Sequence, residues 1–287
     1  MTFTRKALLC GQLLLMLSQT VIAVKIQETS AFQACVAAPT TCTRFNFNRR
    51  GLTGTIPSEL GALSSLTDLS LGYNHLSGTL PSELAALLSL TDLSLDHNQI
   101  MGTIPSELAT LTNLLYLDLN NNRLTGTMPS ELAVLARLTN MDLDNNWLMG
   151  TVPTELGALT NLKLMYLFHN QLTGRLPSEL AAITSLSGMY ICNNNGLCGD
   201  IPAGVTPNTG YNHWQCPSGA TTGTNLGLAC QPSPPIAPVS RPEDDSSKHP
   251  LKDNWFRKRD VARKAAFPQR YSWFRKQAQL MDKNTTI

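Results

Sequence analysis

The leucines of this chain recur with a fixed period of 24 residues, so that Leu69 of one unit corresponds to Leu93 of the next. One proline marks each unit, and these prolines are Pro57, Pro81, Pro105, Pro129, Pro153 and Pro177. A fixed period over about 150 residues indicates a repeat architecture. Stacked units bury an apolar stripe that a single unit would leave in contact with water, so isolated repeats should not fold.

Each unit predicts a short strand followed by two turns. The Leu69-x-Leu71 step has a period of two, which is typical of a β-strand. A glycine such as Gly78 marks the second turn, and proline then fixes the backbone before a short helical segment at 58–60. An asparagine follows each strand at a fixed offset, where its amide can bond exposed backbone groups. These asparagines, which we expect to form a ladder, are Asn74, Asn98, Asn122, Asn146, Asn170 and Asn194.

The unit L-x-x-L-x-L-x-x-N-x-L-x-G-x-I-P-x-x-L closely resembles the plant-type leucine-rich repeat, and residues 114–129 are an intact copy of its central part. The resemblance implies an α/β solenoid, a right-handed superhelix with a concave parallel β-sheet and short helical or 3-10 segments on the convex side. Family members include ectodomains of plant receptor kinases, receptor-like proteins and polygalacturonase-inhibiting proteins. They bind peptides, proteins or glycans. Arg50 departs from the pattern because it stands in the asparagine column, which suits a terminal repeat.

The two ends of the chain differ in composition from the repeats. A positive start at Arg5 and Lys6, followed by an apolar run, is typical of a secretory signal peptide. No later stretch approaches the roughly 20 apolar residues that a membrane span needs, so we expect a secreted, extracellular protein, at the cell surface or in the wall, and not a receptor kinase. We divide the chain into a signal peptide (1–23), an N-terminal cysteine cap (24–43), a solenoid of about seven repeats (44–203), a C-terminal cysteine cap (204–231), and a proline-rich linker with a basic tail expected to be disordered (232–287).

The cysteines flank the repeats. Of the seven, Cys10 lies in the predicted signal peptide. The other six are Cys35, Cys42, Cys192, Cys198, Cys216 and Cys230. An even set after export predicts disulfides, which are needed where a solenoid ends and its core would otherwise be open. Cys35 and Cys42 form the natural first pair, and the other four allow three pairings.

The side chains between the leucines of each strand should face away from the core. Strands stack about 4.7–4.9 Å apart, so these side chains form one surface, acidic in its first part and aromatic in its later part. An acidic strip that runs into an exposed aromatic patch suits a basic peptide or protein with an apolar anchor; the alternative is a solvated face with incidental aspartates. The candidate binding residues on this concave face are Asp68, Asp92, Asp96, Tyr116, Asp118, Asp142, Asp144, Tyr166, Phe168 and Tyr190.

Other site chemistry is not indicated. Calcium needs six to eight oxygen ligands that converge on one point, and a flat sheet spreads its aspartates apart. His97 and His169 share one column but would lie about 14 Å apart at the spacing of strands, too far to bind one metal ion. The serines recur at one repeat position, and no nucleophile elbow or phosphate loop appears. We therefore expect no metal, no cofactor, no catalytic residue and no enzyme.

Charge separates the C-terminal tail from the rest of the chain. The net charge is +2, but residues 241–287 carry 12 basic and 6 acidic residues, whereas residues 24–240 carry 8 and 14. The sequence Trp-Phe-Arg-Lys occurs at 255–258 and again at 273–276. Aromatic and basic pairs suit an anionic membrane surface, a glycan or an acidic protein face; the alternative is a plain solvated tail. A nucleic-acid partner is not expected for an exported chain.

These patterns favour a recognition protein. We expect it to bind an extracellular protein or peptide through the concave face, in surface signalling or defence. Two alternatives stay open. The first is an inhibitor of an extracellular polysaccharide-degrading enzyme, and the second is a structural wall or matrix protein anchored by its basic tail.

Overall fold

The computed structural model describes residues 24–194, 196–204 and 225–226. The chain divides into two units, Met1–Ser233 and Pro234–Ile287, and every described residue belongs to the first. The expectations for the signal peptide, for most of the C-terminal cap with Cys216 and Cys230, and for the basic tail therefore lie outside the described residues.

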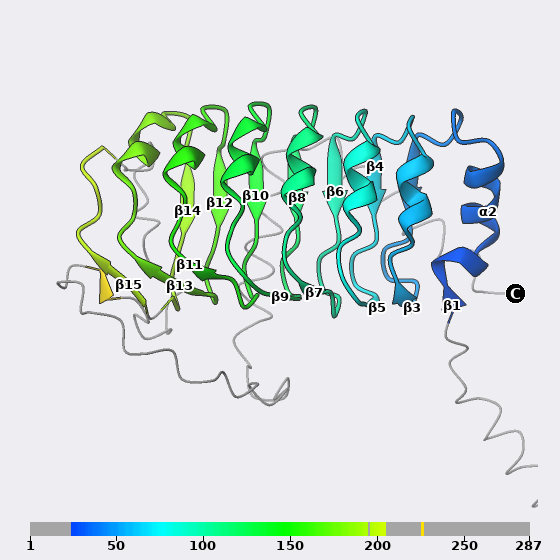
Figure 1. Ribbon diagram of the computed structural model, residues 1–287, viewed down its shortest axis with the longest axis horizontal. Helices are drawn as coiled ribbons and strands as arrows, with labels where there is room; N and C mark the ends of the chain where they lie inside the picture. The colour runs from blue at the N-terminus through cyan, green and yellow to red at the C-terminus, as the bar shows by residue number, and fades with distance from the viewer. Residues whose placement is uncertain (1–23, 195, 205–224, 227–287) are drawn as a thin grey trace, which may run out of the picture. The chain divides into compact units, whose positions relative to one another are not determined.

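A sheet of seven parallel strands runs along the solenoid in the order β14-β12-β10-β8-β6-β4-β2 (Figure 1). The strands are β2 (Arg44–Asn46), β4 (Asp68–Ser70), β6 (Asp92–Ser94), β8 (Tyr116–Asp118), β10 (Asn140–Asp142), β12 (Leu164–Tyr166) and β14 (Gly188–Tyr190). Leu69 pairs with Leu93, and Leu93 pairs with Leu117. Each residue therefore pairs with the residue at the same position of the next repeat. Residues at one repeat position form a continuous row across this main sheet. The expected strand at each Leu-x-Leu step is confirmed.

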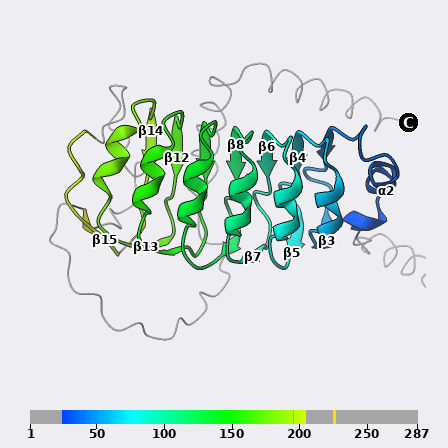
Figure 2. The same ribbon diagram turned by 45° about the horizontal axis from the view of Figure 1, so that its top comes forward.

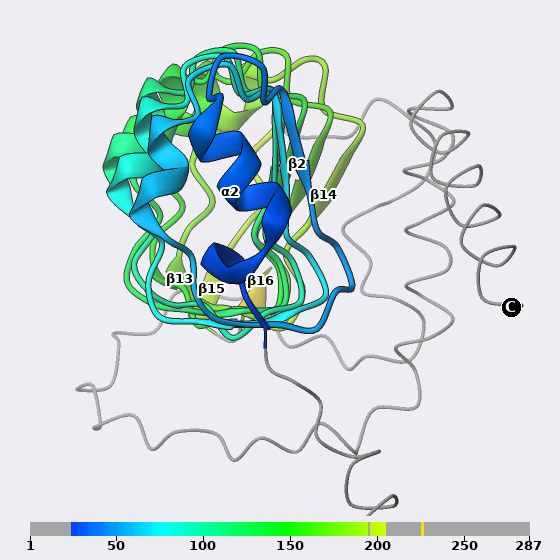
Figure 3. The same ribbon diagram turned by 90° about the vertical axis from the view of Figure 1, so that its right-hand side faces the viewer.

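Short 3-10 helices stack on the side opposite the main sheet (Figures 2 and 3). They are η2 (Ser58–Ala62), η3 (Ser82–Ala86), η4 (Ser106–Thr110), η5 (Ser130–Val134), η6 (Thr154–Ala158) and η7 (Ser178–Ala182). A proline stands immediately before each helix, and the Pro57 oxygen accepts a bond from the Leu60 amide at 3.2 Å. Proline fixes φ at a value that suits this entry. Within the described part of the chain, no helix has the length and apolar character needed to cross a membrane.

A second set of short strands follows the asparagines and was not expected from the sequence. These strands are β3 (Leu52–Thr55), β5 (His75–Ser77), β7 (Met101–Gly102), β9 (Arg123–Leu124), β11 (Met149–Gly150), β13 (Gln171–Gly174), β15 (Gly196–Gly199) and β16 (Asn225–Leu226). They pair in parallel as β7-β9 and β11-β13-β15-β16, and the strand β1 (Val24–Lys25) joins β3 and β5 in the order β1-β3-β5. Glycine is required here because Gly78 has a φ of 76° and a Cβ would lie 2.8 Å from Thr55 Cγ2.

The leucine columns form one continuous core between the main sheet and the helices. Leu69, Leu93 and Met141 have no exposed surface, although methionine replaces leucine at the last position. Burial of each aliphatic side chain contributes about 1.5–3 kcal/mol. Ordering the backbone offsets most of this gain, so each repeat depends on its neighbours for stability.

The N-terminal cap closes one end of this core (Figure 3). It consists of β1 (Val24–Lys25), η1 (Ile26–Glu28) and α2 (Ser30–Ala37). The Phe32 ring on α2 meets the Phe45 ring edge-on at 6.2 Å, and a disulfide joins Cys35 to Cys42. Aromatic side chains thus cover the leucines that no earlier repeat protects.

The asparagine column connects successive repeats through the main chain. Asn122 Nδ2 donates to the oxygens of Leu95, Leu119 and Asn120 at 2.9–3.2 Å, and its Oδ1 accepts from the Ile100 amide at 3.0 Å. The same pattern recurs at Asn146 and at the other buried members of the column. Each amide thereby satisfies backbone groups of two repeats at once, at a bend where no strand partner is present.

Candidate binding surface

The side chains that alternate with the leucines of the main sheet form what we call the outer sheet face. Strand register arranges them in three rows. The rows are Asp68, Asp92, Tyr116, Asn140, Leu164 and Gly188; Ser70, Ser94, Asp118, Asp142, Tyr166 and Tyr190; and Gly72, Asp96, Asn120, Asp144, Phe168 and Cys192. From β4 to β14 the rows contain six aspartates and no lysine, arginine or histidine. Arg44 on β2 is the register partner of Asp68 at the N-terminal end of the first row, so a cationic ligand is favoured electrostatically beyond that end.

Hydroxyl groups hold one aspartate of β4 and one of the bend after β6 in place. Ser70 Oγ donates to Asp68 at 2.6 Å, and Ser94 Oγ donates to Asp96 at 2.7 Å. The Asp96 carboxylate lies against Gly72, where a Cβ would overlap it. The absence of a side chain at Gly72 therefore makes room for the carboxylate at the same position of the next repeat.

The carboxylates on β8 and β10, and on the bend after β10, are withdrawn from water. Asp118, Asp142 and Asp144 have exposed fractions of 6%, 2% and 0%. The Asn120 side chain donates to Asp118, and Asn145 Nδ2 donates to Asp144 at 2.8 Å. Charge interactions are stronger where water is excluded, so these carboxylates should dominate the electrostatics of the face.

Two tyrosines form the C-terminal part of the face. The Tyr166 and Tyr190 rings stack at 4.7 Å with an angle of 6° between their planes. A Cβ at Gly188 would lie 3.1 Å from Tyr190 Cε2, so glycine leaves room for the ring to lie over the sheet. Burial raises the pKa of the Tyr190 phenol above its ordinary value.

The structure corrects the expected exposure of the aromatic patch. Tyr166 and Phe168 are buried, with exposed fractions of 3% and 5%, whereas Tyr190 and Tyr116 are half-buried. Side chains on adjacent parallel strands are close enough to pack against one another, and Tyr166 stacks on Tyr190 instead of standing alone. The burial of the aspartates likewise weighs against a fully solvated face.

A column at the edge of the outer sheet face was recognised in the sequence only at His97 and His169, and its left-handed backbone was not expected. Its members have a left-handed φ between 51° and 59° and are Arg49, Tyr73, His97, Asn121, Asn145, His169 and Asn193. The Arg49 guanidinium lies 4.2 Å from the centre of the Tyr73 ring, which stacks on His97 at 4.0 Å. His97 Nδ1 is 3.2 Å from Asp96 Oδ2. The signal in the sequence is positional: each member directly precedes a repeat's asparagine column.

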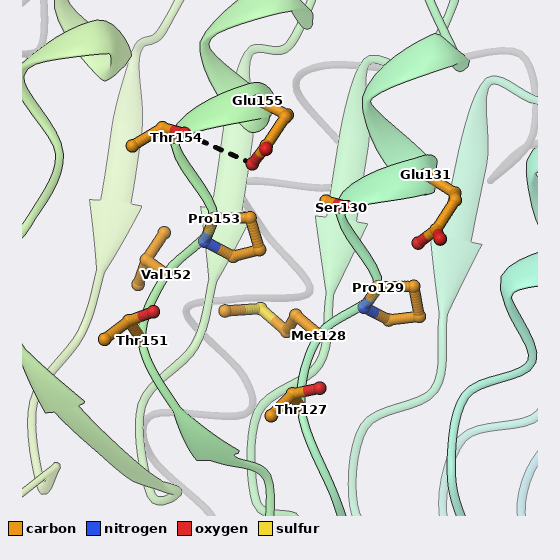
Figure 4. Close-up of a pocket in the computed structure, with 10 residues that line it drawn as sticks. All are labelled: Thr127, Met128, Pro129, Ser130, Glu131, Thr151, Val152, Pro153, Thr154 and Glu155. Atoms are coloured by element: carbon orange, nitrogen blue, oxygen red, sulfur yellow. Dashed lines mark hydrogen bonds between the residues drawn. The ribbon is translucent and has the colours of Figure 1, made fainter.

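The structure describes two of the four cysteines predicted to form disulfides at the C-terminal end of the repeats. Cys198 is disulfide-bonded, and Cys192 is buried in the third row. A hollow of about 450 Å³ lies between two repeats on the helix side, and no candidate binding residue lines it. Figure 4 shows its lining residues. Its lining residues, 127–131 and 151–155, repeat the turn sequence found in the other units, so nothing distinguishes it as a specific site.

A family model described as Leucine Rich Repeat matches the chain at residues 65–87, 89–111, 113–135, 137–159 and 161–183. No curated protein sequence matches the chain.

Several solved solenoids resemble the structure. The ectodomain of the plant membrane receptor kinase GASSHO1/SCHENGEN3 from Arabidopsis thaliana, in complex with CASPARIAN STRIP INTEGRITY FACTOR 2, is 34% identical over 60% of this chain and 20% of its own, with a TM-score of 0.58. The Arabidopsis receptor kinase HAESA, in complex with the peptide hormone IDA and a co-receptor, is 36% identical over 54% and 26%, with a TM-score of 0.53. A plant ice-binding protein is 34% identical over 56% and 50%, with a TM-score of 0.51. The chain thus spans only about a fifth to a quarter of the two receptor ectodomains.

Proposed function

Because this chain is a leucine-rich-repeat protein, we propose that it is a secreted recognition module that binds a basic segment of an extracellular protein or peptide. The observation that carries the proposal is the composition of the outer sheet face. Beyond Arg44 on β2, six aspartates with no basic residue among them lead, in strict register, to a stacked pair of tyrosines. Aromatic anchors beside complementary charge are typical of protein-binding surfaces.

The structural neighbours support this use of the fold. Two of them were solved in complex with a factor or a peptide hormone, and both are plant receptor kinases. By analogy, the chain would act outside the cell in surface signalling or defence. The same scaffold hosts many ligands, so the side chains of this chain, and not its fold, determine which ligand it binds.

A capture experiment tests the proposal. The full chain is immobilised and offered basic and acidic synthetic peptides, alongside the variant Asp118→Asn/Asp142→Asn. We expect the basic peptides to bind the unaltered chain and to lose most of their affinity for the variant, because two carboxylates become neutral without a change of shape. A matched control, Glu131→Gln/Glu155→Gln, removes the same charge from the helix side and should retain binding. Equal capture by both variants would show that this face is not the site.

A second candidate function is adsorption to ice, the activity named for one similar solenoid. The observation that favours it is a row of exposed threonines beside the second set of strands: Thr55, Thr79, Thr103, Thr127 and Thr151. The Cγ2 methyl of each packs against the glycine of the next repeat, which fixes the direction of the hydroxyls. Regularly spaced hydroxyls can hold water molecules in an ordered row.

Partition of the full chain into slowly growing ice tests this second function. The substitution Thr103→Lys/Thr127→Lys should expel the chain from the ice, because two charges interrupt the row, whereas Glu107→Lys on the helix side should not. If the unaltered chain stays in the liquid, ice adsorption is excluded. The inhibitor and wall-anchor alternatives remain predictions from the sequence, since no described contact favours either.

A further inference from the structure

The main sheet ends at β2, which has a strand on one side only. Within the described residues β2 pairs with β4 alone, whereas each strand from β4 to β12 pairs on both sides. The Phe47 amide donates to the Ser70 oxygen of β4 at 2.7 Å. Alternate residues of a strand direct their main-chain groups to opposite sides, so the N–H and C=O groups of Arg44 and Asn46 point away from β4. We call these four groups the open edge.

Later repeats pair the same main-chain groups. Asp68 and Asp92 stand at the position of Arg44, and their amides donate to the oxygens of Thr43 and Thr67, one repeat earlier, at 3.3 and 3.1 Å. Unpaired N–H and C=O groups at the edge of a sheet are a template for another strand. The open edge can therefore accept one more strand in the way that β4 accepts β2.

An aromatic ring beside the open edge is incompletely covered. Leu71 and Leu95 stand at the position of Phe47 and have no exposed surface, but Phe47 is half-buried. The cap helix α2 lies beside β2 (Figure 3) and its Phe32 ring meets Phe45, while Phe47 stacks on Phe45 at 4.6 Å. An apolar side chain on an added strand would cover the rest of the Phe47 ring.

The charge at this end is opposite to that of the outer sheet face beyond it. Arg44 lies on β2, Arg49 and Arg50 follow the strand, and all three side chains are exposed. Among the described residues, no ion pair involves Arg44 or Arg50. Asp68, the register partner of Arg44, offsets part of this positive charge, and the remainder favours an acidic partner.

We infer that the open edge binds an extended segment of a partner protein in which acidic and apolar residues alternate. The segment adds a strand to the main sheet, with its main chain bonded to Arg44 and Asn46. Successive side chains of a strand point to opposite faces, so every second side chain covers Phe47 and the others face Arg44. Main-chain bonds supply affinity in this mode of recognition, and the alternate side chains supply specificity. This site goes beyond the proposed function, because it takes a ligand of opposite charge at another part of the solenoid.

Calorimetric titration of the full chain with synthetic peptides tests the inference. Two peptides share one composition: in the first, glutamate and valine alternate, and in the second, all glutamates precede all valines. We expect the alternating peptide to bind about tenfold more tightly, which corresponds to about 1.4 kcal/mol. Methylation of its main-chain nitrogens should abolish binding, because the donors to the open edge are lost. Equal affinity for the two peptides, undiminished binding after methylation, or no binding by either peptide would overturn the inference.

A pair of variants tests the open edge from the side of the protein. Asn46→Pro removes an amide that points away from β4, and proline is tolerated on edge strands at such positions. It should abolish binding of the alternating peptide. Asn46→Ala is the matched control, since both variants lose the side chain that accepts from the Asn48 amide at 3.3 Å, but alanine keeps the N–H and should bind the peptide normally. Equal binding by both variants would overturn the inference. Thermal melting checks each fold, and the methylated peptide makes the same test if Asn46→Pro does not fold.

Charge variants separate this site from the outer sheet face. Arg44→Glu should weaken binding of the alternating peptide severalfold, whereas Arg137→Glu, which changes an exposed arginine bonded to Asn113, should not. The face variant Asp118→Asn/Asp142→Asn should bind the alternating peptide as the unaltered chain does, and loss of binding there would overturn a separate site.

A second copy of the chain is the other possible occupant of the open edge. Sedimentation of the chain without peptide should show a monomer. A dimer that Asn46→Pro abolishes and Asn46→Ala retains would assign the open edge to self-association and overturn the acidic segment as its ligand.

Discussion

The asparagine ladder and the outer sheet face lie a few residues apart in every repeat and share one register, yet they differ in what their side chains contact. Ladder amides bond to main-chain groups, whereas face carboxylates bond to side chains such as Ser70 and Ser94. The ladder residue is identical in six repeats, and the face residues change from one repeat to the next. A position whose partner is the backbone is fixed by the fold, and one whose partners are side chains is free to vary and to recognise a ligand.

Truncation of a core leucine between these two regions should lower the free energy of unfolding most. Leu119 has no exposed surface, and Leu119→Ala should lower the free energy of unfolding by about 2–5 kcal/mol, because a cavity opens between repeats. Denaturant unfolding measures the loss. Leu88→Ala is the control, since Leu88 is 59% exposed and its truncation should change stability by less than about 0.5 kcal/mol. Similar losses of stability at both positions would mean that the buried and exposed leucines of the repeat have been assigned wrongly.

The ladder should give the next largest effect. Asn146→Ala removes a side chain that bonds to four backbone groups and should cost about 1–3 kcal/mol, because buried donors and acceptors lose their partners. Thermal melting compares it with Asn161→Ala, which removes one exposed bond to the Ala136 oxygen. If the two variants have the same melting temperature, the ladder asparagines do not stabilise the fold through their buried hydrogen bonds.

Replacement of the glycine in the second turn should lower stability less than loss of a ladder asparagine. Gly126 has a φ of 75°, and a Cβ there would lie 2.8 Å from Thr103 Cγ2. Gly126→Ala should therefore lower the free energy of unfolding by about 1–2 kcal/mol, because alanine is strained in a left-handed backbone conformation. The clash of its Cβ with Thr103 Cγ2 should lower it further. Thr103→Ser removes the methyl group, so the double variant should recover the steric part alone in thermal melting. No recovery would assign the whole cost to the backbone.

Sequence periodicity was sufficient to predict the fold and the core, because a fixed 24-residue phase determines which side chains stack. Met141 shows this, since it keeps its column and stays fully buried. The second set of strands was missed because each is two to four residues long, and most lie at or near a glycine that indicates only a turn. The left-handed backbone of the column that contains His97 and His169 was not expected, because other members such as Arg49 and Tyr73 share its position and no chemistry. Exposure of Tyr166 depends on how its ring packs against the next strand, which no pattern along the chain specifies.

The smallest expected effect concerns the titration of the face. Because burial raises the pKa of Tyr190 in the folded chain, the unfolded chain loses this proton first, and stability should fall as the pH rises above about 10, the ordinary value for tyrosine. Tyr190→Phe should remove this contribution, which melting curves at several alkaline pH values would detect. A ladder amide does not titrate, so Asn146→Ala should leave the pH dependence unchanged. An unaltered alkaline profile in Tyr190→Phe would contradict the burial of this phenol.

The most direct measurement is a paired titration of a basic peptide into Asp118→Asn/Asp142→Asn and into Asn146→Ala, each with its melting curve. If the outer sheet face is the recognition surface, the first variant loses peptide affinity while it melts close to the unaltered chain. The second variant melts earlier and, at temperatures where it is folded, keeps its affinity. Undiminished binding by the first variant, or a loss of binding that merely follows unfolding, would contradict the separation of fold and recognition between these two regions.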